Sequence, residues 1–383
     1  MDPVSVKRER VLTALRDRRE PDRVPLTDFY WTDFYRNWLR EMNLPEGTDI
    51  YEYYDLDVKL ITPNIDPRVE SCRVLEQTKD YVVFKSGFGC TVKKDFSAPM
   101  PMFLDFEVKS ASELSSFRFE DPRDDRRYFE PRCDILNNGD SFGLLPSYLE
   151  ALDQNQSKFA VFGSVCEPHE AMWRIRGTEG LLMDLAVESQ KVKDFAERVT
   201  DFMLGVLERQ TELADLTGII IWGDVAYDKG MFFSPDTWWK IYYPCVKRLC
   251  DVIREKGLLA VYHGCGRSLD IFEGLIEAGV QVYNPLEAKA GMDPVELKKR
   301  FGDRIAFYGG IDMRLLGEGS WEEVQQEVLY KLQAGQGGGY MPASDHSVAS
   351  NVNPRIYDRM ITLLKERGSY PLDLNSQNYG HHI

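Results

Sequence analysis

A histidine and a cysteine stand two residues apart in the segment VYHGCG, residues 261–266. The chain has only five histidines and seven cysteines, so this pair invites a chemical explanation. Alternate residues of a β-strand point to the same side, and His263 and Cys265 can therefore reach one metal ion. Zinc binds thiolate, imidazole and carboxylate, and a catalytic zinc site has about three protein ligands and one open position. The alternative is that Cys265 is a buried structural thiol at the end of a strand.

Polar residues also follow the other short apolar runs. Barrel enzymes carry their catalytic groups at the carboxyl ends of the strands, so these side chains are expected to converge on one mouth. Glu287, in VQVYNPLE, and His346, in GGYMPASDH, are the candidates to complete the metal site. The other polar residues of this kind are Glu167, His169, Asp224, Asn284, Asp312 and Asp345. Plainer interpretations exist, because Asp224 and Asp312 are equally suited to cap the following helices. Glu287 and His346 are equally typical of solvated loops.

Short apolar runs alternate with helical segments through the carboxyl-terminal part of the chain. This alternation predicts strands joined by helices in a parallel sheet. A helix over 4–18, a strand over 23–29 and a further strand within 55–62 precede it, which brings the predicted number of strands to eight. Eight strand–helix units favour an α/β fold of the closed (β/α)8 TIM-barrel type over an open doubly wound sheet.

We expect one domain over residues 1–383, with residues 66–158 forming an insertion or accessory layer within it. Inside that segment, RVLEQTKDYVVFKSGFGCTVKKDF combines alternating apolar residues with glycines. Such a pattern is typical of short strands joined by turns.

The composition excludes several classes of partner. The chain has 62 acidic and 47 basic residues, a formal net charge of −15, which disfavours nucleic acid and an anionic membrane surface. No run of about 20 apolar residues predicts a membrane span, and the charged amino terminus does not resemble a secretory signal. An odd number of irregularly spaced cysteines is typical of reduced thiols. We therefore expect a cytoplasmic enzyme with a small-molecule substrate, and a homodimer as the candidate assembly.

Three segments carry a family pattern. They are KRERVLTALRDRREPDRVP, EPHEAMWRIRGTEGLLMDL, and YHGCG followed by LIEAGVQVYNPLEAKAGMDPVELKKRFGDRIAFYGGID. They resemble the uroporphyrinogen decarboxylase superfamily, which implies a (β/α)8 barrel with its active cleft at the carboxyl ends of the strands. True decarboxylases carry an Arg-Gln-Ala-Gly-Arg-Tyr stretch after the first strand, whereas this chain has TDFYWTDFYRNWLRE there. The departure predicts negligible decarboxylation of uroporphyrinogen, although Asp57 in YYDLDVKLITP matches the pyrrole-binding aspartate of those enzymes.

A second branch of the superfamily contains zinc-dependent methyltransferases of corrinoid systems. Those enzymes have His-x-Cys followed by a distant cysteine, and cobalamin-independent methionine synthase, on a similar barrel, adds a glutamate between them. The resemblance implies that His263, Cys265 and Glu287 are zinc ligands, with His346 in place of the distant cysteine. Imidazole is a competent zinc ligand, so the substitution is compatible with the site. The resemblance also implies a corrinoid, carried by a partner protein that binds it.

We therefore expect a zinc-dependent methyltransferase that moves a methyl group between a small substrate and a corrinoid protein or thiol. The predicted catalytic residues are Asp224, Glu167 and Asp57, because a carboxyl group can supply or accept a proton. Aromatic and polar side chains near the strand ends suit a flat substrate such as a methoxylated aromatic. The predicted substrate-binding residues are Tyr30, Trp31, Trp222, Tyr227, Asn284 and Asp312. Ordinary packing at a barrel mouth is the alternative explanation for these aromatic residues.

Two other functions stay open at this point. In a metal-free decarboxylase, Asp57 or Asp224 would bind a cationic or pyrrole-like group, and Arg174 and Arg176 would bind carboxylates of the substrate. In a non-catalytic barrel, the mouth would only bind a corrinoid or a partner protein. The many ionisable residues expected at one mouth disfavour that third function.

Overall fold

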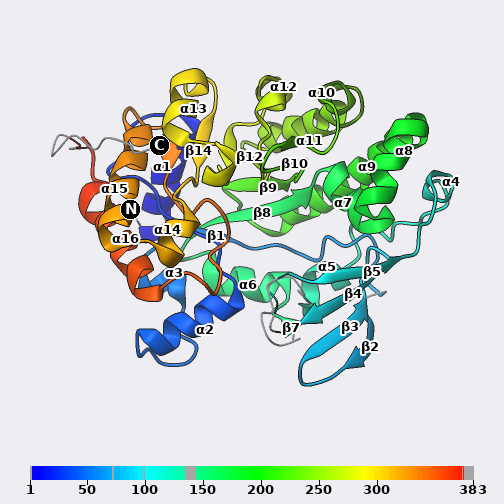
Figure 1. The fold of residues 1–383 in the computed structure, drawn as a ribbon, viewed down its shortest axis with the longest axis horizontal. Helices are drawn as coiled ribbons and strands as arrows, with labels where there is room; N and C mark the ends of the chain where they lie inside the picture. The colour runs from blue at the N-terminus through cyan, green and yellow to red at the C-terminus, as the bar shows by residue number, and fades with distance from the viewer. Residues whose placement is uncertain are drawn as a thin grey trace.

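A parallel sheet of seven strands forms the centre of the molecule (Figure 1). The computed structural model describes residues 2–70, 73–96, 98, 100–133, 144–372 and 374. Each strand of the sheet pairs in parallel with the next. In spatial order the strands are β1 (Val58–Leu60), β8 (Ala160–Cys166), β9 (Gly218–Trp222), β12 (Leu259–His263), β13 (Val282–Asn284), β14 (Ala306–Tyr308) and β15 (Tyr340–Met341). The α/β class with a parallel sheet is thus confirmed.

The strand predicted over 23–29 is wrong, because the backbone there forms isolated bridges only, at Arg23 and Tyr30. The N–H of Leu26 donates to the side chain of Asp57 (2.7 Å) and not to a neighbouring strand. The segment nevertheless runs beside β1, since the N–H of Asp57 donates to the carbonyl of Leu26 (2.7 Å). The described sheet therefore has seven strands where eight were predicted.

Helices follow the strands and pack against the sheet. Caps in the sequence set several of their starts: Asp293 accepts the N–H groups of Val295 and Glu296, and Ser320 forms a capping box with Glu323. The helices that follow strands of the main sheet are α7 (Pro168–Arg176), α8 (Thr178–Val187), α9 (Ser189–Leu213), α10 (Pro235–Thr237), α11 (Tyr243–Glu255), α12 (Phe272–Ala278), α13 (Pro294–Phe301), α14 (Met313–Glu318), α15 (Trp321–Leu332) and α16 (Pro354–Arg367). The others are α1 (Pro3–Val11), α2 (Thr32–Glu41), α3 (Ile50–Tyr53), α4 (Ala111–Leu114), α5 (Arg126–Phe129) and α6 (Tyr148–Asn155). None of the helices described is both long and apolar enough to cross a bilayer.

An antiparallel sheet lies between β1 and β8 in the chain. Its strands, in spatial order, are β2 (Arg73–Gln77), β3 (Tyr81–Lys85), β4 (Cys90–Asp95) and β5 (Met102–Phe106). Figure 1 shows it at the lower right, on the opposite side of the molecule from α1 and α16. Buried and partly exposed residues alternate along β3 and β4. The buried Val82, Phe84 and Val92 belong to the same core cluster as residues of α7 and α9. Among the described residues, two smaller antiparallel pairs are β6 (Arg132–Cys133) with β7 (Leu144–Leu145), and β10 (Ala226–Tyr227) with β11 (Gly230–Met231).

The two faces of the main sheet are covered by different parts of the chain. Val261 of β12 is fully buried in one cluster with Val11 and Leu15 of the amino-terminal helical segment, and we call this face the inner face. Tyr262, the next residue, is buried in another cluster with residues of α9 and α11 on the outer face. Burial of an aliphatic side chain contributes about 1.5–3 kcal/mol, so the alternation along β12 is strongly specified. His263, two residues after Val261, therefore faces inward.

Candidate functional site

Three predicted site residues form one rung at the carboxyl ends of adjacent strands. Trp222 ends β9, His263 ends β12 and Asn284 ends β13, and His263 pairs in register with each of the other two. Register partners in parallel strands point to the same face, so all three side chains lie on the inner face. The rings of Trp222 and His263 are 4.5 Å apart between centroids and meet edge to face.

Cys265 lies in the middle of the candidate metal ligands. Its Sγ lies 3.6 Å from Nε2 of His263. The potential ligand atoms of Asp224, His263 and Cys265 all lie within 4.8 Å of one another, and so do those of Cys265, Glu287 and His346. The four predicted metal ligands therefore fall into two overlapping groups that share Cys265, one with His263 and Asp224, which was not predicted as a ligand, and one with Glu287 and His346.

His263 is buried and neutral in this environment. Removal from water lowers the pKa of His263 to about 4, although its hydrogen bond to Asn284 acts in the opposite direction. Nδ1 of His263 and Oδ1 of Asn284 are 2.5 Å apart. A neutral imidazole is the form that binds a metal ion.

The thiol of Cys265 lies among negative charges. Its backbone N–H donates to Oδ1 of Asp224 (2.9 Å), and that of Gly266 donates to Oε2 of Glu287 (2.8 Å). Burial raises the pKa of the Cys265 thiol well above its ordinary value, and the carboxylates of Asp224 and Glu287 raise it further. Burial likewise raises the pKa of Asp224. A cation placed between these groups would favour both the thiolate and the carboxylates.

Two aspartates hold the loop that carries His346. Asp345 accepts the N–H of Ala288 (2.9 Å), the residue after Glu287, and the N–H of Met313 (3.0 Å). Asp28 accepts the hydroxyl of Ser344 from the other side. Burial raises the pKa of Asp345 to about 6 and that of Asp28 to about 7. Asp28 was missed as a site residue, although it lies near the end of the predicted strand 23–29, where the strand-end argument could have found it.

Aromatic side chains form one wall of the site. Phe29 lies 5.9 Å from Trp222, 6.4 Å from His263 and 6.0 Å from Tyr308 between ring centroids. The predicted Trp31 lies 6.5 Å from the ring of His346. These rings offer an apolar surface beside the candidate metal ligands.

The predicted Tyr227 lies at the rim of the site. It is 46% exposed and stacks on Phe232 at 5.8 Å. Its carbonyl accepts the N–H of Arg267 (2.8 Å), two residues after Cys265. The β10–β11 hairpin that carries Tyr227 is thereby attached to the loop of the candidate metal centre.

Asp57 is not part of this site. It directly precedes β1, and because the strands are parallel it lies at the amino edge of the sheet, opposite to His263. It is fully buried in ion pairs with Arg10 (2.5 Å) and Arg23 (2.7 Å). These contacts give Asp57 a structural role in holding the amino-terminal segment.

Asp312 lies at the carboxyl end of β14 but is already engaged. Its Oδ1 accepts the N–H of Arg314 (2.8 Å) as the cap of α14, and its carboxylate pairs with the Arg314 guanidinium (2.6 Å). The helix-cap interpretation of Asp312 therefore describes its contacts.

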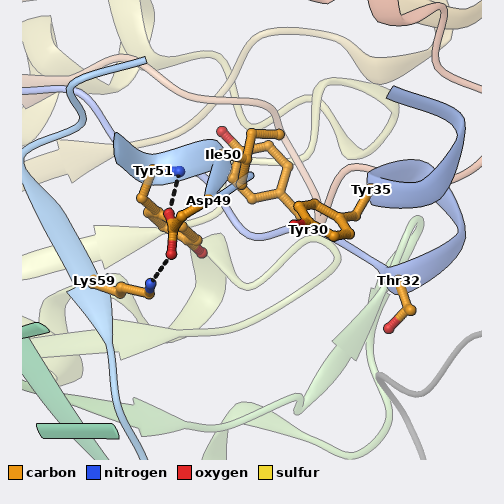
Figure 2. Close-up of a pocket in the computed structure, with 7 residues that line it drawn as sticks. All are labelled: Tyr30, Thr32, Tyr35, Asp49, Ile50, Tyr51 and Lys59. Atoms are coloured by element: carbon orange, nitrogen blue, oxygen red, sulfur yellow. Dashed lines mark hydrogen bonds and ion pairs between the residues drawn. The ribbon is translucent and has the colours of Figure 1, made fainter. Parts of the chain in front are cut away.

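Tyr30 faces away from the candidate metal ligands, into a separate surface pocket. Figure 2 shows this pocket of about 230 Å³, where the carboxylate of Asp49 accepts hydrogen bonds from the N–H of Tyr51 (2.8 Å) and from Lys59 (2.6 Å). The hydroxyl of Tyr30 is 2.7 Å from that of Tyr357. The full lining is Tyr30, Thr32, Tyr35, Asp49, Ile50, Tyr51 and Lys59, which includes none of the predicted metal ligands.

Glu167 is buried behind the site. Neither oxygen of its buried carboxyl group has a hydrogen-bond partner among the described residues, and the nearby hydroxyl of Tyr262, whose ring belongs to the outer face, donates to the carbonyl of Gly223 (2.9 Å). Burial raises the pKa of Glu167 well above its ordinary value, and the neighbouring Glu170 and Asp224 carboxylates raise it further. Burial therefore favours the uncharged form of the Glu167 carboxyl group, which lies toward the helices.

His169 supports the Asp224 loop from the same side. Its Nδ1 lies 3.0 Å from the carbonyl of Asp224, and burial lowers the pKa of His169 to about 4. Its ring packs against Phe233 at 5.0 Å and Tyr242 at 5.6 Å. His169 thus acts in the packing around the site and has no contact with the predicted metal ligands.

Comparison with known proteins gives one family and one informative fold. Residues 122–367 match the family model described as uroporphyrinogen decarboxylase (URO-D). The chain is similar in fold to a methyltransferase from Methanosarcina mazei, with a TM-score of 0.63 and 14% sequence identity, over 94% of this chain and 98% of that one. No curated protein matches the sequence.

Proposed function

Because the chain belongs to the uroporphyrinogen decarboxylase (URO-D) family, we propose that it is a zinc-dependent methyltransferase of a corrinoid-linked system. The observation that carries the proposal is the cluster around Cys265, with His263 Nε2 at 3.6 Å and Glu287 and His346 within 4.8 Å. The fold shared with a methyltransferase supports the same reading. We propose His263, Cys265, Glu287 and His346 as the ligands.

The donor set fits zinc. Two imidazoles, a thiol and a carboxylate suit a borderline-soft cation, whereas calcium and magnesium select oxygen ligands. The carboxylates that raise the pKa of the Cys265 thiol also favour a positively charged ligand at this place. When bound, zinc would supply Lewis acidity toward an oxygen or stabilise a substrate thiolate.

The remaining side chains divide the work of binding and proton transfer. Trp222, Phe29 and Trp31 would hold a small apolar substrate such as a methoxylated aromatic. In the reaction we propose, the oxygen–methyl bond breaks, and the methyl group passes to a corrinoid on a partner protein or to a thiol. The oxygen leaves as a hydroxyl, and the proton that it takes up would come from water by way of the Asp224 carboxylate, which lies among the candidate ligand atoms.

The contacts disfavour a metal-free decarboxylase. Asp57 lies at the wrong edge of the sheet for the cationic group of such a substrate. Arg174 pairs with Glu170, and Arg176 pairs with Asp184 (2.8 Å), so neither guanidinium is free to bind a substrate carboxylate. We propose that the chain does not decarboxylate uroporphyrinogen.

We also propose that the segment before β1 takes the place of the eighth strand in a barrel. The chain would then be one domain over 1–383, with 66–158 as an insertion. A homodimer remains our proposal for its assembly.

The zinc content of the protein tests the proposed function. Wild type, purified without chelators or an affinity tag, should contain about one zinc per chain, and Cys265→Ala should contain almost none. Cys250→Ala is the matched control, because Cys250 is a fully buried thiol of α11 outside the site and its loss should leave zinc unchanged. A wild type without zinc, or equal zinc in wild type and Cys265→Ala, would overturn the proposal.

A further inference from the structure

Two hydrogen bonds fix the orientation of the Asn284 side-chain amide. Its Nδ2 lies 3.0 Å from the carbonyl oxygen of Tyr308, and its Oδ1 lies 2.5 Å from Nδ1 of His263. A carbonyl oxygen can only accept, so the NH2 group of Asn284 must face Tyr308. The amide oxygen of Asn284 is therefore left to face His263.

That orientation selects one tautomer of His263. The amide oxygen of Asn284 only accepts, so Nδ1 of His263 must carry the hydrogen. In the neutral ring, the lone pair then lies on Nε2, and Nε2 is the atom that faces Sγ of Cys265 at 3.6 Å. The edge-to-face contact with Trp222 at 4.5 Å holds the plane of the ring in this position.

The backbone places the two residues together independently of their side chains. His263 and Asn284 are register partners in β12 and β13, and the N–H of Gly264 donates to the carbonyl of Asn284 (2.9 Å). A change of the Asn284 side chain therefore leaves the strand pairing in place and removes the contacts of its amide with the imidazole and with the Tyr308 carbonyl.

We propose that Asn284 is a positioning residue that holds His263 in the Nδ1–H tautomer and directs Nε2 to the Cys265 side of the site. Asn284 then acts through His263 and not by binding substrate. The proposal rests on the proposed function in one respect: the orientation of His263 serves to present Nε2 to zinc. The tautomer itself does not depend on whether metal binds.

The first experiment reads the tautomer directly in metal-free protein. The chain has five histidines, so a ¹⁵N spectrum of protein labelled at histidine is simple enough to assign by comparison with a His263→Gln variant. Wild type should show His263 with the hydrogen on Nδ1 only. In Asn284→Leu the signal should move toward the Nε2–H form, and in Asn284→Asp, which keeps an acceptor, the Nδ1–H form should persist. A wild type with the hydrogen on Nε2, or Asn284→Leu with an unchanged tautomer, would overturn the proposal.

The second experiment reads the consequence for metal. Zinc affinity, measured by competition with a chromogenic chelator, should fall about 10–100-fold in Asn284→Leu, as for other residues that orient a ligating histidine, and much less in Asn284→Asp. Asn155→Leu is the matched control: Asn155 is a buried asparagine of α6 that bonds to Ala151 and Lys59, outside the site. Unchanged zinc affinity in Asn284→Leu contradicts the positioning role.

The two readouts separate the possible failures. Wild type that binds no zinc but shows the Nδ1–H tautomer overturns the proposed function and supports the orientation by Asn284. Wild type that binds zinc with the other tautomer overturns only the role of Asn284. If Asn284→Leu does not fold, the tautomers of wild type and Asn284→Asp decide the question.

Discussion

Replacing Asp57 by alanine should destabilise the protein by about 3 kcal/mol and leave the candidate metal centre intact. Asp57 is fully buried and pairs with two arginines, Arg10 at 2.5 Å and Arg23 at 2.7 Å. Its carboxylate also accepts the N–H of Leu26 (2.7 Å). The variant would leave two guanidinium groups and one N–H at the amino edge of the sheet without this acceptor.

The size of the loss depends on which contacts each arginine retains in the variant. Removing one partner of a buried ion pair costs about 3–5 kcal/mol, because the other charge stays buried and unpaired. Arg10 retains a second ion pair, with Asp22 at 2.5 Å, and the side chain of Arg23 is 16% exposed to water. Both facts reduce the loss, and we therefore expect a value near the lower end of that range.

Urea titration followed by far-ultraviolet circular dichroism measures the free energy of unfolding. Asp22→Ala is the matched control, since its carboxylate binds the same Arg10 but its side chain is 58% exposed. Exposed ion pairs contribute about 1 kcal/mol or less, so the control should lose much less than Asp57→Ala. Zinc content should equal that of wild type in both variants. An Asp57→Ala protein that is as stable as wild type but inactive would refute this reasoning and return Asp57 to a catalytic role.

Two further predictions concern the buried acids. Burial raises the pKa of Asp28 to about 7. The folded chain therefore keeps a proton on Asp28 that the unfolded chain releases above about pH 4. As a result, the free energy of unfolding is highest below about pH 4 and falls as the pH rises to 7. Asp28→Asn stays neutral, so its stability relative to wild type should rise by about 3 kcal/mol between about pH 4.5 and 7 in paired urea titrations, and a constant difference would contradict the burial argument. Glu167→Gln should keep its zinc and nearly its full rate of methyl transfer, because burial favours the uncharged form of Glu167, which glutamine resembles, and because Glu167 lies behind the site. A loss of about 100-fold in rate, as expected for removal of a general acid, would place Glu167 in the reaction.

Local pattern was sufficient to predict which polar residues lie near one another at the carboxyl edge of the sheet. The two-residue period predicted that His263 and Cys265 lie close together, and they do, although β12 ends at His263 and Cys265 belongs to the loop that follows. The order of strands and helices puts the ends of β9, β12, β13 and β15 at one edge of a parallel sheet. Glu287 and His346 were found by the same argument. These inferences use only the residue types and their spacing along the chain, and the proximity that they predict is seen in the two groups around Cys265.

Contacts between distant segments decided the rest. The segment over 23–29 has the composition of a strand, but its Leu26 N–H bonds to the Asp57 carboxylate, and no local pattern encodes that choice. Asp57 directly precedes β1, so in this parallel sheet it lies at the amino edge, whereas the candidate metal ligands lie at the carboxyl edge. Its contacts with Arg10 and Arg23 come from segments that local pattern does not bring together.

The role of Asn284 depends on register in the same way. Its contact with His263 exists because β12 and β13 pair with these two residues opposite each other, 21 positions apart in the chain. The hydrogen bond between Asp28 and Ser344 spans 316 positions. Residue types and their spacing therefore determined which groups could bind a metal, whereas strand register and loop contacts, which are set by packing of the whole chain, determined how each group is oriented.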